Sequence, residues 1–145
     1  MTYTQLKEKC LAKMAKDVYG LSQMTDPTNP AKVYLGSNDT ISRKDLCIGQ
    51  GEELLLEHKN TEEHILVTTK RMILYNTRGG KESVNFDGLI GITDDTLECD
   101  WEVENDSILP FSVEFTHSVR TLQCRANAFF VMIITINVVS DFYPL

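Results

Sequence analysis

Residues 64–86 read HILVTTKRMILYNTRGGKESVNF, and this stretch decides the fold. His64–Thr68 and Met72–Thr77 are short runs of the residue types that favour strands. Gly79-Gly80 stands between the second run and Ser83–Phe86. Adjacent glycines suit the central positions of a type I′ turn, because both positions need positive φ. The stretch therefore predicts antiparallel strands joined by tight hairpins.

Similar patterns lie on both sides of this stretch, and the connections between them are short. Asp87-Gly88 reads as a turn or bulge, so Ser83–Thr93 counts as one interrupted strand. Short connections favour antiparallel pairing in a meander. The sequence thus predicts seven strands: Glu53–His58, His64–Thr68, Met72–Thr77, Ser83–Thr93, Leu97–Glu104, Leu109–Phe115 and Val119–Arg125.

An amphipathic helix is predicted at the N-terminus, before a linker at Met24–Asn38. Its apolar stripe recurs at spacings of three and four residues: Tyr3, Leu6, Cys10, Met14, Val18 and Leu21. Its lysines outnumber its acids, as in helices that lie on membranes or dock in grooves: Lys7, Lys9, Lys13 and Lys16. We favour the simpler alternative, in which the helix packs on its own acidic domain with its lysines in water.

The C-terminal segment Ala128–Val139 is apolar and rich in β-branched residues, so propensity alone favours a strand. Its length favours a helix from about Asn127 to Asp141. A helix that is apolar all round must be covered on both sides. The sheets provide one cover, and the N-terminal helix or a second subunit provides the other. A homo-oligomer through this segment is therefore an alternative. The segment is shorter than the roughly 20 residues that cross a bilayer.

The order of these elements resembles the pleckstrin-homology-like (PH-like) pattern, in which seven antiparallel strands precede one helix. Gly51–Asp95 is similar to the first half of bacterial PH-like domains and, more distantly, of GRAM domains. The matching motifs are Gly51-Glu52, Leu66–Met72 (LVTTKRM) and Ile90–Asp95. The resemblance implies a mainly β (α+β) barrel closed by the C-terminal helix. It divides the chain into residues 1–48, the helix and linker packed on the barrel, and residues 49–145, the PH-like domain.

Charge and motifs exclude several functions. The net charge of −7 disfavours nucleic acid, which needs a positive footprint. No apolar leader precedes the first helix, and the four cysteines lack zinc-like spacing, so we expect a cytoplasmic protein with reduced thiols. Signatures of catalysis are absent. We therefore expect no enzyme, catalytic residue, cofactor or metal site.

A strictly alternating acidic segment is the first candidate binding surface. In the predicted strand Leu97–Glu104, the apolar residues face the core: Leu97, Cys99, Trp101 and Val103. The carboxylates share the outer face: Glu98, Asp100, Glu102 and Glu104. A plain solvated face is the simpler interpretation. The functional one is a docking face for a basic protein partner, including one that an immunity-type inhibitor would mask.

A second candidate surface would bind phosphate or anionic lipid through basic residues near two turns: Arg78, Lys81, Lys70 and Arg71. In PH families that bind inositol phosphates, the resemblance places the ligand at the first loop, here Lys59–Glu63. This loop is not basic, which argues against lipid. His58 and His64 flank the same loop and could meet on one side of a hairpin as the start of a metal site, although exposed loop positions are the simpler interpretation. We conclude that the sequence predicts a non-catalytic interaction module, with lipid adaptor and immunity-type inhibitor as alternatives.

Overall fold

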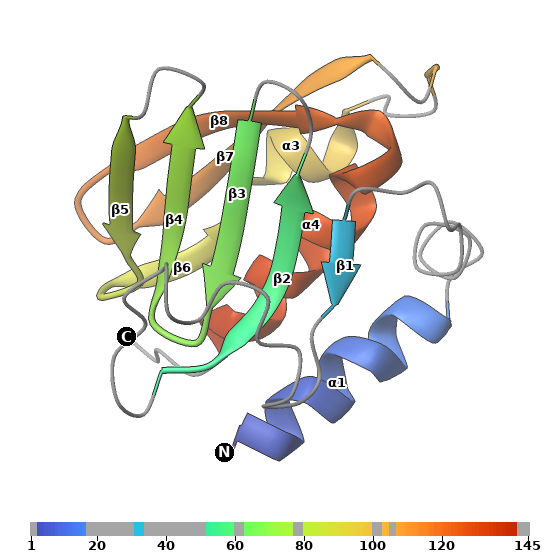
Figure 1. Cartoon of the computed structure of the whole chain (residues 1–145), viewed down its shortest axis with the longest axis vertical. Helices are drawn as coiled ribbons and strands as arrows, with labels where there is room; N and C mark the ends of the chain where they lie inside the picture. Colours follow the sequence, from blue (N-terminus) through green and yellow to red (C-terminus); the bar gives the residue numbers. More distant parts are fainter. Residues whose placement is uncertain are drawn as a thin grey trace.

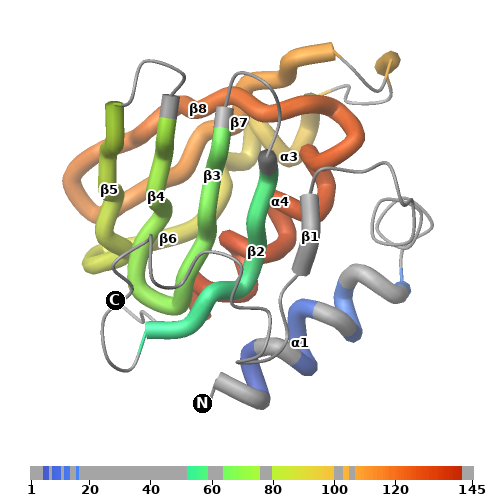
Figure 2. Tube along the Cα trace, viewed as in Figure 1, coloured from blue at the N-terminus to red at the C-terminus, as the bar shows by residue number. Residues whose placement is uncertain are grey.

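The computed structural model describes residues 3–16, 31–33, 52–59, 63–76, 80–99, 103–104 and 107–141 (Figure 2). Strands predominate, and helices lie at both ends of the chain (Figure 1). The elements in chain order are α1 (Tyr3–Ala15), β1 (Ala31–Val33), β2 (Leu54–Lys59), β3 (Glu63–Thr68), β4 (Arg71–Asn76), β5 (Lys81–Asn85), β6 (Leu89–Ile92), α3 (Asp94–Glu98), β7 (Ile108–Phe115), β8 (Val119–Arg125) and α4 (Ala126–Ser140).

The strands form two antiparallel sheets, a five-stranded sheet β1-β2-β3-β4-β5 and a three-stranded sheet β6-β7-β8. The second sheet crosses behind the first, and α4 lies behind β1 and β2 (Figure 1). These findings confirm the mainly β, antiparallel prediction with a C-terminal helix. The predicted closed barrel is wrong, because among the described strands β5 pairs only with β4 and β8 only with β7.

The five-stranded sheet carries apolar side chains on both faces. Alternation along β3 sends Ile65 and Val67 into the main core between the sheets and α4. Leu66 points to the opposite face, where it packs with Leu54 and Ile73 in a second small cluster. Leu66 lies opposite Ile73 in the register of β3 and β4, so this cluster follows directly from strand pairing. The face turned toward the other sheet is called the inner face below.

The C-terminal helix α4 confirms the preference for helix over strand. Most of its side chains are buried, among them Phe129, Met132 and Ile136. The sheets cover one side of α4, and α1 packs against it from another, with Leu6 and Cys10 fully buried in the same core. An ion pair between Lys9 and Asp141 joins the two helices. The sheets and α1 therefore both cover this apolar helix, as the sequence led us to expect of one of the two alternatives.

The predicted acidic strand Leu97–Glu104 is wrong. Residues 94–98 form the short helix α3 instead, and Leu97 and Val103, expected in the core, are exposed. Local chemistry contributes to the difference, because Asp94 and Asp95 occupy the first turn, where the helix dipole favours negative charge. Alternation was a weaker signal than these terminal residues.

A strand also forms inside the predicted linker Met24–Asn38. Ala31–Val33 makes β1, which pairs antiparallel with β2 along Leu56–His58. The local sequence pattern did not indicate a strand here. These three residues form a strand because β2 supplies their hydrogen-bond partners, and a local pattern does not show such a partner. Val18 and Leu21 of the predicted N-terminal stripe lie outside the described residues.

Within the described ranges, no helix is both long and apolar enough to cross a membrane.

Candidate functional site

The two sheets part on the side where β5 and β8 are both sheet edges. A hollow of about 300 Å³ opens there between the inner faces. Its floor is apolar, formed by Ile65, Leu74 and Leu122. Its rim is polar and includes Lys81, Glu82 and Gln123. An apolar floor under a polar rim is the usual composition of a binding pocket, and the volume is at the small end of the usual range.

A second hollow, of about 570 Å³, continues along the free edge of β5. Residues 83–85 form one wall, and residues 115–118 at the connection between β7 and β8 form the other. An ion pair between Glu82, from the first hollow, and Arg120, from the second, crosses between the sheets. Both side chains are roughly half exposed, so this pair contributes little to stability. The two hollows together are called the β5 groove below.

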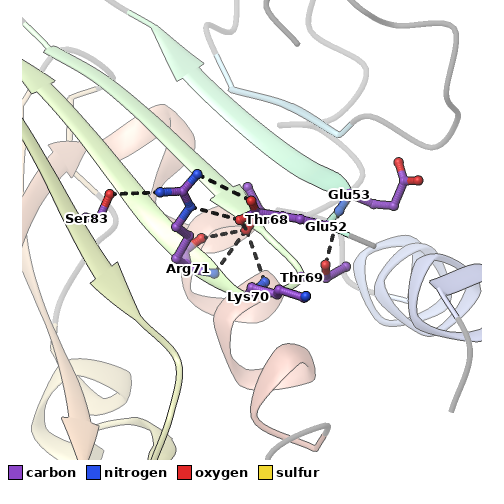
Figure 3. A network of polar contacts seen from close by, with 7 residues as sticks. All are labelled: Glu52, Glu53, Thr68, Thr69, Lys70, Arg71 and Ser83. Atoms are coloured by element: carbon purple, nitrogen blue, oxygen red, sulfur yellow. Dashed lines mark hydrogen bonds and ion pairs between the residues drawn. The ribbon is translucent and has the colours of Figure 1, made fainter. Parts of the chain in front are cut away.

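A buried polar network lies on the outer face of the five-stranded sheet (Figure 3). The Glu52 carboxylate is buried and accepts hydrogen bonds from the Thr68 hydroxyl at 2.6 Å and the Arg71 Nε at 3.0 Å. Thr68 Oγ1 also accepts the backbone N–H groups of Lys70 and Arg71. The Arg71 guanidinium extends further, to Ser83 Oγ at 3.2 Å. Three strands are thereby held together by one carboxylate, one hydroxyl and one guanidinium.

This network gives a structural role to the motifs that carried the PH-like resemblance. Glu52 comes from Gly51-Glu52, and Thr68 and Arg71 come from Leu66–Met72. Next to it, Thr69 Oγ1 accepts the Glu53 backbone N–H at 3.1 Å. The paired motifs therefore fasten the β3–β4 turn to the start of β2.

The basic residues predicted to bind phosphate do not converge in the described structure. Arg71 is engaged by Glu52, while Lys70 is exposed beside it. Lys81 lies opposite Tyr75. Tyr75 is four residues after Arg71 on β4, and four residues of a strand span roughly 14 Å. The Lys81 ammonium is 5.9 Å from the centre of the Tyr75 ring. Arg78 lies outside the described residues.

The acidic residues predicted to bind a partner are divided between α3 and the segment after it. Glu98 is exposed at the end of α3, after the exposed Asp94 and Asp95. Glu104 is also exposed, but in irregular structure. Asp100 and Glu102 lie outside the described residues. The regular row of carboxylates is lost together with the strand that would have aligned it.

The two histidines that flank the β2–β3 hairpin, and that could have met on one side of it, point to opposite faces. His58 lies opposite Ile65 on the inner face and is fully buried. His64 lies on the outer face, where its Nε2 is 2.9 Å from the Glu57 carboxylate. They therefore cannot share a metal ion. The part of the chain that the structure describes holds no cluster of three or more metal-ligating side chains.

The environment of His58 changes its titration. Burial in the core, followed by the charges of Arg125 and His64, lowers the pKa of His58 to about 4. The described cysteines are free thiols: Cys10, Cys99 and Cys124. Burial raises the pKa of Cys10 to about 12, so this thiol stays protonated and behaves as a small apolar residue.

Sequence reasoning missed the β5 groove. The Gly79-Gly80 hairpin and the charged Lys81-Glu82 pair indicated where β5 begins, and charged residues are common on free sheet edges. Nothing in the sequence indicated that β8 would stay unpaired from β5, because that depends on how the two sheets cross.

No protein-family model, curated protein or solved structure matches this chain.

Proposed function

We propose that this protein is a non-catalytic interaction module of PH-like fold that holds a partner protein in the β5 groove. The observation that carries the proposal is the opening between the sheets, where an apolar floor of Ile65, Leu74 and Leu122 lies beneath a polar rim. The arrangement of two antiparallel sheets followed by α4 supports the fold assignment. Apolar pockets with a polar rim accept a side chain from a partner and exclude water around it.

The groove is preferred to the two surfaces predicted from sequence for geometric reasons. Its walls come from two sheets, so it is concave and its floor is partly shielded from water. The exposed carboxylates near α3 are solvated, and exposed charges by themselves contribute mainly to the association rate. Lys81, on β5 opposite Tyr75, lies far along the sheet from Arg71, and the Arg71 guanidinium is paired with Glu52. A protein partner therefore fits the described residues better than a lipid head group.

A pair of matched variants tests this function. Gln123→Trp places a large side chain on the rim of the groove. Thr121→Trp places the same side chain on the same strand, at an exposed position that lines neither hollow. Cross-linking and quantitative proteomics in the native host should recover a defined partner with the wild type and with Thr121→Trp. Gln123→Trp should lose that partner.

A third variant separates the groove from the acidic surface. Glu98→Lys combined with Glu104→Lys reverses two exposed charges and leaves the groove intact. Retention of the partner by this variant supports the groove. Loss of the partner here, with retention by Gln123→Trp, would move the docking site to the acidic segment and overturn the proposal.

A further inference from the structure

The β5 groove contains the free edge of a strand, and the direction of its backbone groups follows from the register. The Phe86 N–H donates to the Lys70 carbonyl at 2.9 Å. Arg71 lies opposite Asn85, and its N–H donates to the Thr68 hydroxyl oxygen on the side of β3, away from β5. Hydrogen-bonded and non-hydrogen-bonded pairs alternate along an antiparallel ladder. Arg71–Asn85 and Ile73–Ser83 are therefore non-hydrogen-bonded pairs.

It follows that Ser83 and Asn85 direct their backbone N–H and C=O groups away from β4. The second hollow lies along these same residues, so the groups open onto space rather than onto another described strand. A free row of backbone donors and acceptors is a template for an added strand.

Two of the other three sheet edges, those of β1 and β6, are protected. β1 has only three residues and packs against α4. β6 also lies against α4, where the Ile92 N–H donates to Asn137 Oδ1 at 2.8 Å. One helix therefore covers two edges, while the described residues leave β5 open beside the hollow. Of the two edges that remain, β5 lines the two hollows along its whole length, whereas β8 contributes three residues, so β5 is the edge that we assign to a partner.

We infer that the β5 groove binds an extended peptide segment of another protein, which adds to the five-stranded sheet as a strand next to β5. This inference rests on the proposed function and names the kind of ligand. Side chains of the added strand alternate between the faces. Those beside Glu82 and Val84 point to the inner face, as Leu74 and Met72 do opposite them, and so toward the apolar floor. The preferred segment has alternating apolar residues.

The shape of the groove favours a single chain over a second copy of this protein. Residues 115–118 line the same hollow as residues 83–85 of β5, so the β5 edge has a second wall beside it. In Figure 1, β5 is the outermost strand of the front sheet and the β7–β8 connection curves beside it. Edge-to-edge pairing of two copies would require this wall to move.

The test uses the full chain and peptides selected from a random-peptide phage library. Ser83→Pro removes the outward N–H without removing a ladder hydrogen bond to β4, and proline is tolerated at such edge positions. Ser83→Ala is the matched control, since it loses the same hydroxyl but keeps the N–H. We expect Ser83→Pro to weaken binding of a selected peptide roughly tenfold or more, and Ser83→Ala to bind as the wild type does. Circular dichroism and thermal melting verify that both variants fold.

A second measurement needs no variant. Peptide addition should slow hydrogen exchange at the Ser83 and Asn85 amides, which face the groove, more than at Glu82 and Val84. Selection of no peptide, or equal affinity in Ser83→Pro, would overturn strand addition. If Gln123→Trp nevertheless blocks the partner found in cells, the proposed function stands and only the strand pairing fails. If hydrogen exchange at the Ser83 amide slows as the protein concentration rises, with no peptide added, the β5 edge pairs with a second copy of the protein. That result would also overturn the inference.

Discussion

Arg71 was a candidate for binding phosphate, and in the structure its guanidinium neutralises the buried carboxylate of Glu52. A buried carboxylate is strongly destabilising when its cationic partner is removed, because desolvation is then uncompensated. Arg71 therefore serves stability, and its long side chain spans from β4 to Glu52, just before β2, and to Ser83 on β5.

Arg71→Ala should lower the free energy of unfolding by about 3–5 kcal/mol, because the buried Glu52 carboxylate then loses its guanidinium partner. Urea denaturation at neutral pH measures this change. Lys70→Ala is the control, since its side chain is exposed in the same turn, and it should change stability by about 0.5 kcal/mol or less. The double variant Glu52→Gln, Arg71→Ala should recover part of the loss. Equal effects of Arg71→Ala and Lys70→Ala would contradict a buried ion pair.

His58 makes stability depend on pH in a defined window. Its pKa falls from 6.5 to about 4 on folding, so the folded state holds the neutral imidazole. Below pH 6.5 the unfolded chain binds a proton that the folded chain does not. The contribution of neutral His58 to the free energy of unfolding is therefore fully present above pH 6.5 and declines as pH falls toward 4. Below pH 4 it levels off, after a loss of roughly 3 kcal/mol.

Urea denaturation at a series of pH values tests this window. His58→Gln should remove most of the decline between pH 6.5 and 4, whatever its effect on absolute stability. His117→Gln changes an exposed imidazole between β7 and β8 and should keep the decline. The assignment fails if both variants titrate as the wild type does.

At the scale of elements, α4 fills the core and also bonds the edge strand β6. Asn137 of α4 accepts a backbone N–H of β6 on the side where β6 has no neighbouring strand. Asn137 Oδ1 accepts the Ile92 N–H at 2.8 Å. Gly91 makes room for this contact: a Cβ at Gly91 would lie 2.8 Å from Asn137 Oδ1, and its φ of 144° suits glycine. A single amide in a mainly apolar helix therefore fixes where the helix docks.

Asn137→Ala should lower the free energy of unfolding by about 1–3 kcal/mol, because the buried Ile92 N–H loses its acceptor. It should also speed hydrogen exchange at the Ile92 amide. Ser140→Ala, one turn away and also next to the Gly91 position, should leave that amide protected. Unchanged exchange at Ile92 in Asn137→Ala would show that water or another group replaces the side chain.

Two elements show where local patterns succeed and fail. β3 and β4 were predicted because their β-branched runs and the hairpin agree with the sheet that they join. The segment Leu97–Glu104 alternated as a strand does, yet its first two residues belong to α3. Thr96 helps to explain this, because its hydroxyl accepts the Ser112 N–H at 2.9 Å and ties α3 to β7. A tertiary hydrogen bond and favourable terminal residues together outweighed period-two alternation.

At the scale of the whole molecule, the order of strands followed from short connections, but the relation between the sheets did not. The sheets cross without closing, so β5 and β8 remain edges and leave the groove between them. The apolar C-terminal helix left a choice between α1 and a second subunit as its cover. In the described structure α1 supplies a cover, because Leu6 and Cys10 pack into the main core and α1 contacts α4.

The sequence by itself determined the antiparallel hairpins and the C-terminal helix, because hydrophobic period, turn residues and segment length act over a few neighbouring residues. Tertiary structure alone decided the role of Arg71, the burial of His58, the strand β1 and the opening beside β5. Each of these depends on which distant segment supplies a hydrogen bond, a charge or a covering side chain. Local patterns carry no information about such partners.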